Sequence, residues 1–159
     1  MRLNQTPLQI DTALEDEFHS SLPWRKRFVK WLSRYSPLLI YYEIPYGRAS
    51  LNSQLSKRTD FSAHEWESRG IKSNSARTIL RLIATVMNLP NEFIIPDDPL
   101  KMLLISDYDD FPIQSLSYAL SKTFKIIYTP EEIIQLATND NWLIEQFVRD
   151  VLSRSPQKF

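Results

Sequence analysis

The strongest hydrophobic pattern in this sequence lies in its C-terminal half. From Ser75 onward, apolar residues recur three and one positions apart, which places them on one face of an α-helix. These residues are Ile79, Leu82, Ile83, Val86 and Met87. The spacing predicts a long amphipathic helix that ends at residues 88–90, where a proline stops it.

A second long helix is predicted after a loop and a short apolar turn over residues 100–105. It begins near residue 111, and the apolar spacing gives it an inward-facing stripe. The residues expected on that stripe are Phe111, Ile113, Leu116, Leu120 and Phe124.

Two shorter helices complete the predicted C-terminal half. Thr129 and Glu132 have the spacing of a capping box, and Pro130 suits the first helical position, so residues 131–136 are expected to form a short helix. A final helix is expected to begin within residues 138–141. Its apolar face would consist of Trp142, Phe147, Val148, Val151 and Leu152.

The first part of the chain carries weaker signals. Residues 1–10 are expected to form a loose leader, and residues 11–19 have helical character because Leu14 and Phe18 lie four positions apart. Residues 24–35 combine an apolar, aromatic stripe with many lysines and arginines, which predicts a basic amphipathic helix.

Residues 38–44 are rich in β-branched and aromatic residues, so they predict either a short strand or an extended apolar segment packed on the bundle. Residues 48–72 are polar, with a start signal for a short helix around Trp66. We therefore expect a mainly α protein, with an N-terminal extension over residues 1–74 and a helical bundle over residues 75–159.

The order of the predicted elements after Ser75 resembles that of an acyl carrier protein. Residues 77–104 contain a long helix, a hydrophilic turn and an apolar loop anchor in the order found in carriers. Residues 111–133 contain a Leu-x-x-x-Leu-x-x-x-Phe spacing similar to a carrier's second helix, and residues 137–152 resemble its last helix. The resemblance covers the C-terminal half and implies a four-helix, acyl-carrier-like bundle.

The serine that the carrier function requires is missing. In carriers, a serine in an Asp-Ser-Leu motif at the start of the second helix holds a phosphopantetheine arm. The matching stretch here reads Asp109, Asp110, Phe111, which places Asp110 at the position of the serine. A carboxylate cannot accept the arm through the usual phosphodiester, so we expect no such cofactor and no carrier activity.

The composition removes several classes of protein from consideration. The chain has 159 residues, of which 43% are hydrophobic, so it can form a packed core. It lacks cysteine, which excludes disulfides and cysteine nucleophiles, and two glycines are too few for a phosphate-binding loop. With neither a signal peptide nor an apolar run long enough to span a membrane, we expect a cytoplasmic protein.

Catalytic and metal-binding signatures are also missing from the sequence. His19 and His64 lie in polar contexts without a nearby set of ligands. The chain has no His-Glu-x-x-His motif and no recognisable catalytic triad, so we expect neither an enzyme nor a metal site.

Charge is distributed unevenly along the chain. Residues 1–77 carry 12 Lys and Arg against 8 Asp and Glu, whereas residues 78–159 carry 7 against 11. This balance argues against nucleic-acid binding by the C-terminal half. The most unusual acidic residues are Asp97, Asp98, Asp107, Asp109 and Asp110.

Three interpretations of these aspartates remain open. They are helix-start charges in a solvated loop, or a surface that steers a basic partner, or a calcium loop. A calcium loop would need a glycine bend and a bidentate glutamate, which are missing. In the partner-binding interpretation, Tyr108 and Phe111 would be the aromatic anchors beside the acidic residues.

The basic segment 24–35 also has more than one interpretation. It can lie on a membrane surface with its aromatic side chains inward, or it can cover the bundle with its basic face in solvent. We favour the second because it is the commoner use of such a helix. Nucleic-acid binding through the same face is disfavoured because the molecule as a whole is neutral.

Two functions of different class fit these patterns. The first is a non-enzymatic protein-binding module, in particular an immunity protein that neutralises a basic nuclease toxin through an acidic surface. The alternative is a degenerate acyl carrier or an accessory protein of fatty-acid or polyketide metabolism. Partners of carriers read acidic residues along the second helix, whereas here that helix region carries Lys122 and Lys125 and no acidic residue.

Overall fold

The structure is a computed structural model that describes residues 5–21, 46–104 and 111–156. It is mainly helical, as predicted, and the described residues include no extended strand. The helices are α1 (Thr12–Ser21), α3 (Arg48–Lys57), α4 (Ala63–Ser68), α5 (Ser73–Val86), α6 (Leu100–Leu103), α7 (Phe111–Phe124), α8 (Pro130–Ala137) and α9 (Ile144–Arg154). None of them is long and apolar enough to cross a membrane.

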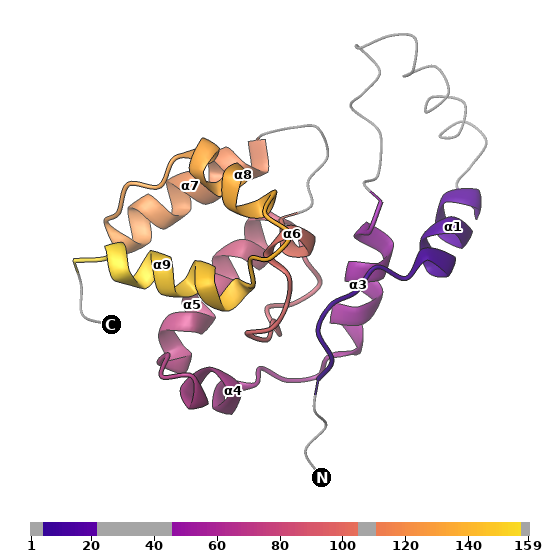
Figure 1. The fold of residues 1–159 in the computed structure, drawn as a ribbon, viewed down its shortest axis with the longest axis horizontal. Helices are drawn as coiled ribbons and strands as arrows, with labels where there is room; N and C mark the ends of the chain where they lie inside the picture. The colour runs from indigo at the N-terminus through magenta and orange to yellow at the C-terminus, as the bar shows by residue number, and fades with distance from the viewer. Residues whose placement is uncertain (1–4, 22–45, 105–110, 157–159) are drawn as a thin grey trace, which may run out of the picture.

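Figure 1 shows how these helices are arranged. Helices α5, α7, α8 and α9 gather into a bundle with α6 beside it, whereas α1 and α3 lie side by side away from α7, α8 and α9. The basic segment 24–35 and the apolar segment 38–44 lie outside the described residues. Their predicted structures stay predictions.

Helix α5 follows the predicted periodicity with one change of register. Its fully buried apolar residues are Ala76, Ile79, Leu80 and Ile83. Leu82 and Val86, which were expected on the inward face, are only partly buried, whereas Leu80, which was not expected there, is fully buried. Because residues three and four apart share a helix face, positions 76, 79, 80 and 83 form one continuous stripe.

The end of α5 is fixed by its backbone. The Leu89 N–H donates to the Ala84 carbonyl over 2.8 Å, and Asn88 between them adopts a left-handed conformation with φ of 51°. This is the Schellman motif, in which asparagine is one of the few residues that tolerates such a conformation. Helix termination at residues 88–90 is therefore confirmed.

Helix α7 has the predicted bounds, but one residue of its inward face was assigned wrongly. Ile113, Leu116, Leu120 and Phe124 are buried, whereas 67% of Phe111 is exposed. At about 100° per residue, Phe111 lies roughly 160° around the helix from Ile113. The buried stripe and Phe111 are therefore on opposite faces.

The predicted capping box at the start of α8 is confirmed. The Glu132 N–H donates to the Thr129 side chain, the Thr129 N–H donates to the Glu132 carboxylate, and Pro130 is the first helical residue. These two hydrogen bonds satisfy backbone donors that the first turn of a helix leaves without partners.

Helix α9 begins later than predicted. Thr138 is the last cap residue of α8, and the chain then makes a turn and an isolated antiparallel bridge between Leu143 and Pro99. The N–H of Ile144, the first residue of α9, donates to the Asp98 carbonyl over 2.9 Å. The loop before α6 therefore sets the start of α9, which the local sequence does not reveal.

The expectation that residues 1–10 form a loose leader is wrong for the described residues 5–10. The side chain of Leu8 is buried, and the Leu8 N–H donates to Asp98 Oδ1 over 2.9 Å. Gln9 pairs with Gln54 of α3 through its backbone N–H and carbonyl. Long-range hydrogen bonds hold this segment against α3.

The N-terminal extension and the bundle share one hydrophobic core. Helix α3, which the sequence interpretation left as a polar stretch, contributes Leu51 and Leu55, both fully buried. The predicted short helix around Trp66 is α4, and the Trp66 side chain is also fully buried in that core. The boundary expected at residues 74 and 75 falls in the first turn of α5, where the core continues.

Candidate functional site

The two neighbouring aspartates at 97 and 98 have opposite environments. Asp98 is fully buried, whereas the Asp97 side chain is 44% exposed. Asp98 therefore cannot belong to an exposed acidic surface, which corrects its expected place among partner-binding residues. Its carboxylate is instead an internal anchor, because a buried charge needs a counterion and hydrogen-bond donors.

Asp98 finds these partners in three separate parts of the chain. Arg58, at the end of α3, donates two hydrogen bonds to the Asp98 carboxylate, from Nη1 to Oδ2 over 2.6 Å and from Nη2 to Oδ1 over 2.8 Å. The backbone N–H groups of Leu8 and Ile95 each donate to one carboxylate oxygen over 2.9 Å. The same guanidinium also donates to the carbonyls of Thr6 and Phe93. The network ties the N-terminal segment, α3 and the loop after α5 into one unit.

Asp97 belongs to a second, more exposed network between α4 and α9. Arg69 contacts Asp97 Oδ2 at 2.5 Å and also pairs with the Glu145 carboxylate of α9. Arg149, one turn further along α9, pairs with Glu145 at 2.8 Å. Asp97 is therefore partly neutralised within the chain, which weakens its expected role in attracting a basic partner.

Arginine contacts change the acidity of two glutamates. Burial alone would raise the pKa of Glu145, but hydrogen bonds and charge from Arg69 and Arg149 outweigh it and hold the pKa below its ordinary value. The pKa of Glu92 is lowered in the same way, because hydrogen bonds from Arg77 and Arg81 outweigh burial. Both glutamates therefore favour the folded state when they are ionised.

The sign of the resulting pH dependence follows directly. Because the folded pKa of Glu145 and Glu92 lies below the unfolded value of about 4.3, their stabilisation is complete above about pH 5. We expect it to disappear as the pH falls from 5 through their folded pKa, which urea unfolding at several pH values would measure. The Glu145→Gln variant should be less stable at pH 7, and its free energy of unfolding should fall less steeply than that of wild type as the pH is lowered below 5. An equally steep fall in that variant would contradict the stabilising role of the Glu145 carboxylate.

Four of the expected site residues, Asp107, Tyr108, Asp109 and Asp110, lie outside the described residues. Phe111 directly follows them in the sequence, begins α7 and is 67% exposed. Such exposure is unusual for a phenylalanine, since large apolar side chains are commonly buried. Of the expected partner-binding residues that the structure describes, Phe111 is the most accessible.

The outward face of α7 carries a second exposed aromatic residue that the sequence interpretation did not single out. Tyr118 is 68% exposed and lies seven positions after Phe111. Lys122, one turn further, is also exposed. We call Phe111, Tyr118 and Lys122 the α7 stripe. The signal for it was the seven-residue aromatic spacing on the face opposite to Leu116 and Leu120.

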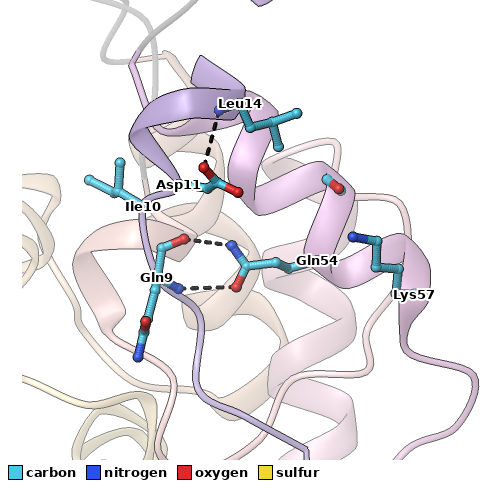
Figure 2. Close-up of a pocket in the computed structure, with 7 residues that line it drawn as sticks. Gln9, Ile10, Asp11, Leu14, Gln54 and Lys57 are labelled. Carbon is cyan, nitrogen blue, oxygen red and sulfur yellow. Dashed lines mark hydrogen bonds between the residues drawn. The ribbon is translucent and has the colours of Figure 1, made fainter. Parts of the chain in front are cut away.

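A hollow of about 440 Å³ lies between the N-terminal segment, α1 and α3. Figure 2 shows its lining, with the Gln54 side chain paired to the Gln9 backbone and Asp11 Oδ1 accepting the Leu14 N–H. Both polar atoms of the Gln54 amide make internal hydrogen bonds. Its Oε1 accepts the Gln9 N–H over 3.1 Å, and its Nε2 donates to the Gln9 carbonyl over 2.5 Å. The hollow is therefore the seam between two packed segments, and no buried charged side chain lines it.

Glu15 and His19 of α1 form a further polar cluster. Glu15 is fully buried, and its Oε1 accepts the Ser50 N–H at the start of α3 over 2.5 Å. The ring of His19 stacks on Tyr46 with centroids 5.8 Å apart, and its Nε2 lies 3.7 Å from Glu15 Oε2. Since Glu15 serves as a cap for α3, the cluster has a clear structural role.

In the described part of the chain, no group of three or more His, Cys, Asp or Glu side chains is arranged to hold a metal ion. No protein-family model, curated protein or solved structure matches this chain.

Proposed function

We propose that this chain is a non-enzymatic protein-binding module. The observation that supports this most directly is the exposed Phe111 at the first position of α7, immediately after an acidic stretch of sequence. Aromatic residues are enriched at the centre of protein–protein interfaces, whereas charged residues belong mostly to the rim, so an exposed phenylalanine next to an acidic stretch fits such a contact. The proposed contact residues are Asp107, Tyr108, Asp109, Asp110 and Phe111.

The charge of these residues indicates the kind of partner. Asp107, Asp109 and Asp110 lie within four positions of one another and include no basic residue between them. A surface of this sign attracts basic proteins, and a toxin that cleaves nucleic acid must itself be basic to hold its substrate. We therefore propose an immunity protein that neutralises a basic nuclease toxin, acting in the cytoplasm where such a toxin meets nucleic acid.

The experiment is affinity capture from a lysate of the source organism with the full chain as bait. Wild type is compared with a variant in which Asp107, Asp109 and Asp110 are replaced by asparagine. We expect wild type to retain a basic protein and inhibit its nuclease activity, with both effects weakened by salt. The triple variant should bind about tenfold or more weakly, since close interfacial charges contribute more than 1 kcal/mol in favourable cases.

A matched control separates a local contact from a general charge effect. Replacing Glu17, Glu131 and Asp140 with Gln, Gln and Asn also removes three carboxylates, which are exposed and lie on other helices and loops. This control should bind the partner as wild type does. Capture of no basic protein, or equal losses in both variants, would refute the immunity interpretation.

A degenerate acyl carrier is the second candidate, and one observation favours it. Helices α5 to α9 follow one another as long, short, long, short and long, an order that resembles a carrier. Intact mass of the chain purified from its own organism tests whether any carrier function remains. A phosphopantetheine arm would add its full mass to the chain and favour this candidate over the immunity proposal. The mass of the unmodified sequence, which the missing serine leads us to expect, would leave this candidate only an accessory role without the arm.

A further inference from the structure

The segment before α1, residues 6–11, is bound to α3 through its backbone. We call it the N-terminal arm, and Figure 1 shows it as an extended segment that passes alongside α3. The Asp11 N–H donates to Ser50 Oγ over 3.0 Å, and the same hydroxyl donates to the Asp11 carbonyl over 3.3 Å. Gln54 binds the N–H and the carbonyl of Gln9 in the same two-way manner.

The spacing of these partners on α3 matches the spacing of the arm. Ser50 and Gln54 lie four positions apart, so they share a face of α3 and are separated by about 6 Å along its axis. Gln9 and Asp11 lie two positions apart, which in an extended chain is about 6.6 Å. The two repeats nearly coincide, so each of these α3 side chains meets one backbone unit of the arm.

Arg58 and Asp98 bind the other end of the arm. Arg58, the residue that follows α3, donates to the Thr6 carbonyl over 2.8 Å, and Asp98 Oδ1 accepts the Leu8 N–H over 2.9 Å. Because the guanidinium and the carboxylate already hold each other, they present a donor and an acceptor to the arm in fixed positions. We call these four residues the arm site: Ser50, Gln54, Arg58 and Asp98.

Leu8 is the one buried side chain of the arm. It is 1% exposed and packs in the shared core, whereas Thr6, Gln9 and Ile10 are exposed. In Figure 2, the Ile10 side chain points away from α3. The arm site therefore recognises backbone groups and a single leucine, so a segment with other side chains at the exposed positions can make the same contacts.

We propose that the arm site is a peptide-binding site and that the N-terminal arm is its replaceable internal ligand. The partner that it fits is an extended segment of another protein with a leucine at the position of Leu8. That segment needs N–H groups, and so no proline, at the positions of Leu8, Gln9 and Asp11. Main-chain hydrogen bonds give affinity in this kind of recognition, and side-chain pockets give specificity. The site shares no residue with the contact at 107–111 that the immunity proposal uses.

The test uses the full chain with Leu8→Asp, which places a charge at the apolar position and releases the arm. The probe is a fluorescein-labelled peptide that copies residues 5–12, and its anisotropy reports binding. We expect a dissociation constant of about 100 µM for this variant, since the peptide is short and has one buried anchor. Wild type should bind about tenfold or more weakly, because its own arm competes at a millimolar effective concentration. The milder Leu8→Ser should rank with Leu8→Asp, and circular dichroism checks that both are folded.

Changes in the peptide separate backbone recognition from side-chain recognition. Replacing its leucine with aspartate should abolish binding, whereas Gln9→Ala with Ile10→Ala should change the affinity little. Gln9→Pro removes the N–H that Gln54 accepts and should weaken binding about tenfold. In the released chain, Gln54→Ala should cause a similar loss. Gln135→Ala, the same change at an exposed position of α8, should cause none.

Four results would overturn the proposal. They are equal binding of the peptide to wild type and to the Leu8 variants, no binding to the folded Leu8 variants, equal binding of the leucine and aspartate peptides, and a wild-type dimer in sedimentation that Leu8→Asp dissociates. In the last case the arm of a second copy would be the occupant. Replacing Asp107, Asp109 and Asp110 with asparagine in the released chain should leave peptide binding unchanged, so this proposal and the immunity proposal fail independently.

Discussion

Replacing Asp98 with alanine is expected to lower the free energy of unfolding by about 3–5 kcal/mol, because it leaves the Arg58 guanidinium buried without its counterion. The Arg58 and Asp98 side chains are 7% and 0% exposed, so solvent cannot replace the lost partner. The N–H groups of Leu8 and Ile95 would also lose their acceptor. Urea unfolding followed by circular dichroism would measure the change.

The neighbouring residue provides the matched control. Asp97→Ala also removes an aspartate carboxylate, one position earlier in the chain. Asp97 is 44% exposed, however, and in this variant Arg69 still pairs with Glu145. Exposed ion pairs contribute about 0–1 kcal/mol, so this variant should stay close to wild type in stability. Similar losses in the two variants would mean that the Arg58–Asp98 pair is not the anchor described above.

A double variant tests whether the cost comes from the orphaned charge. Replacing both partners with apolar residues, Arg58→Met and Asp98→Leu, removes the buried charge altogether. Such replacements of buried ion pairs are often close to neutral, so the double variant should recover a large part of the loss. Recovery would be incomplete because Leu8 and Ile95 N–H groups would still lack an acceptor.

The contrast between Asp97 and Asp98 shows what sequence patterns leave undetermined. The two residues are adjacent, chemically identical and equally placed in an acidic loop. Their difference comes from Arg58, which lies 40 positions before Asp98 in the chain. No local pattern records such a contact, so the sequence predicted one acidic surface where the structure has an anchor and an exposed ion pair.

Local signals predicted structure well wherever the controlling contacts lie within a few residues. The start of α8 follows from Thr129, Pro130 and Glu132, and each side-chain contact expected there is present. Helix α3 was missed because Leu51 and Leu55 are its only buried apolar residues, too few to establish a periodicity. Its stability depends on packing against the shared core, which the local pattern does not contain.

The sequence predicted the exposed residues of the α7 stripe only in part. Phe111 was expected both as an aromatic anchor and on the inward face of α7, and the structure leaves it exposed. Tyr118 was overlooked because an aromatic residue between Leu116 and Leu120 does not by itself disturb a helical pattern. Which face of α7 packs against the core depends on its neighbours α5 and α9, and their positions are known only from the fold.

Replacing Trp66 with alanine is expected to destabilise the chain by about 3–5 kcal/mol, because a fully buried tryptophan leaves a large cavity behind. Its indole N–H also donates to the Ile94 carbonyl over 3.2 Å, and that acceptor would be left buried without its partner. The Trp66→Phe variant keeps most of the apolar volume and should lose less. Urea unfolding followed by tryptophan fluorescence would measure both variants.

The shape of the unfolding transition carries as much information as its midpoint. Trp66 belongs to the N-terminal extension, yet it packs in the same core as Ile79 and Leu80 of the bundle. If the extension and bundle fold as one unit, Trp66→Ala shifts a single transition in which circular dichroism and fluorescence coincide. Two separated transitions, with the bundle unfolding at its wild-type midpoint, would show instead that the bundle is stable without the extension. We expect the single transition, because Leu51, Leu55 and Trp66 are fully buried in contact with one continuous core.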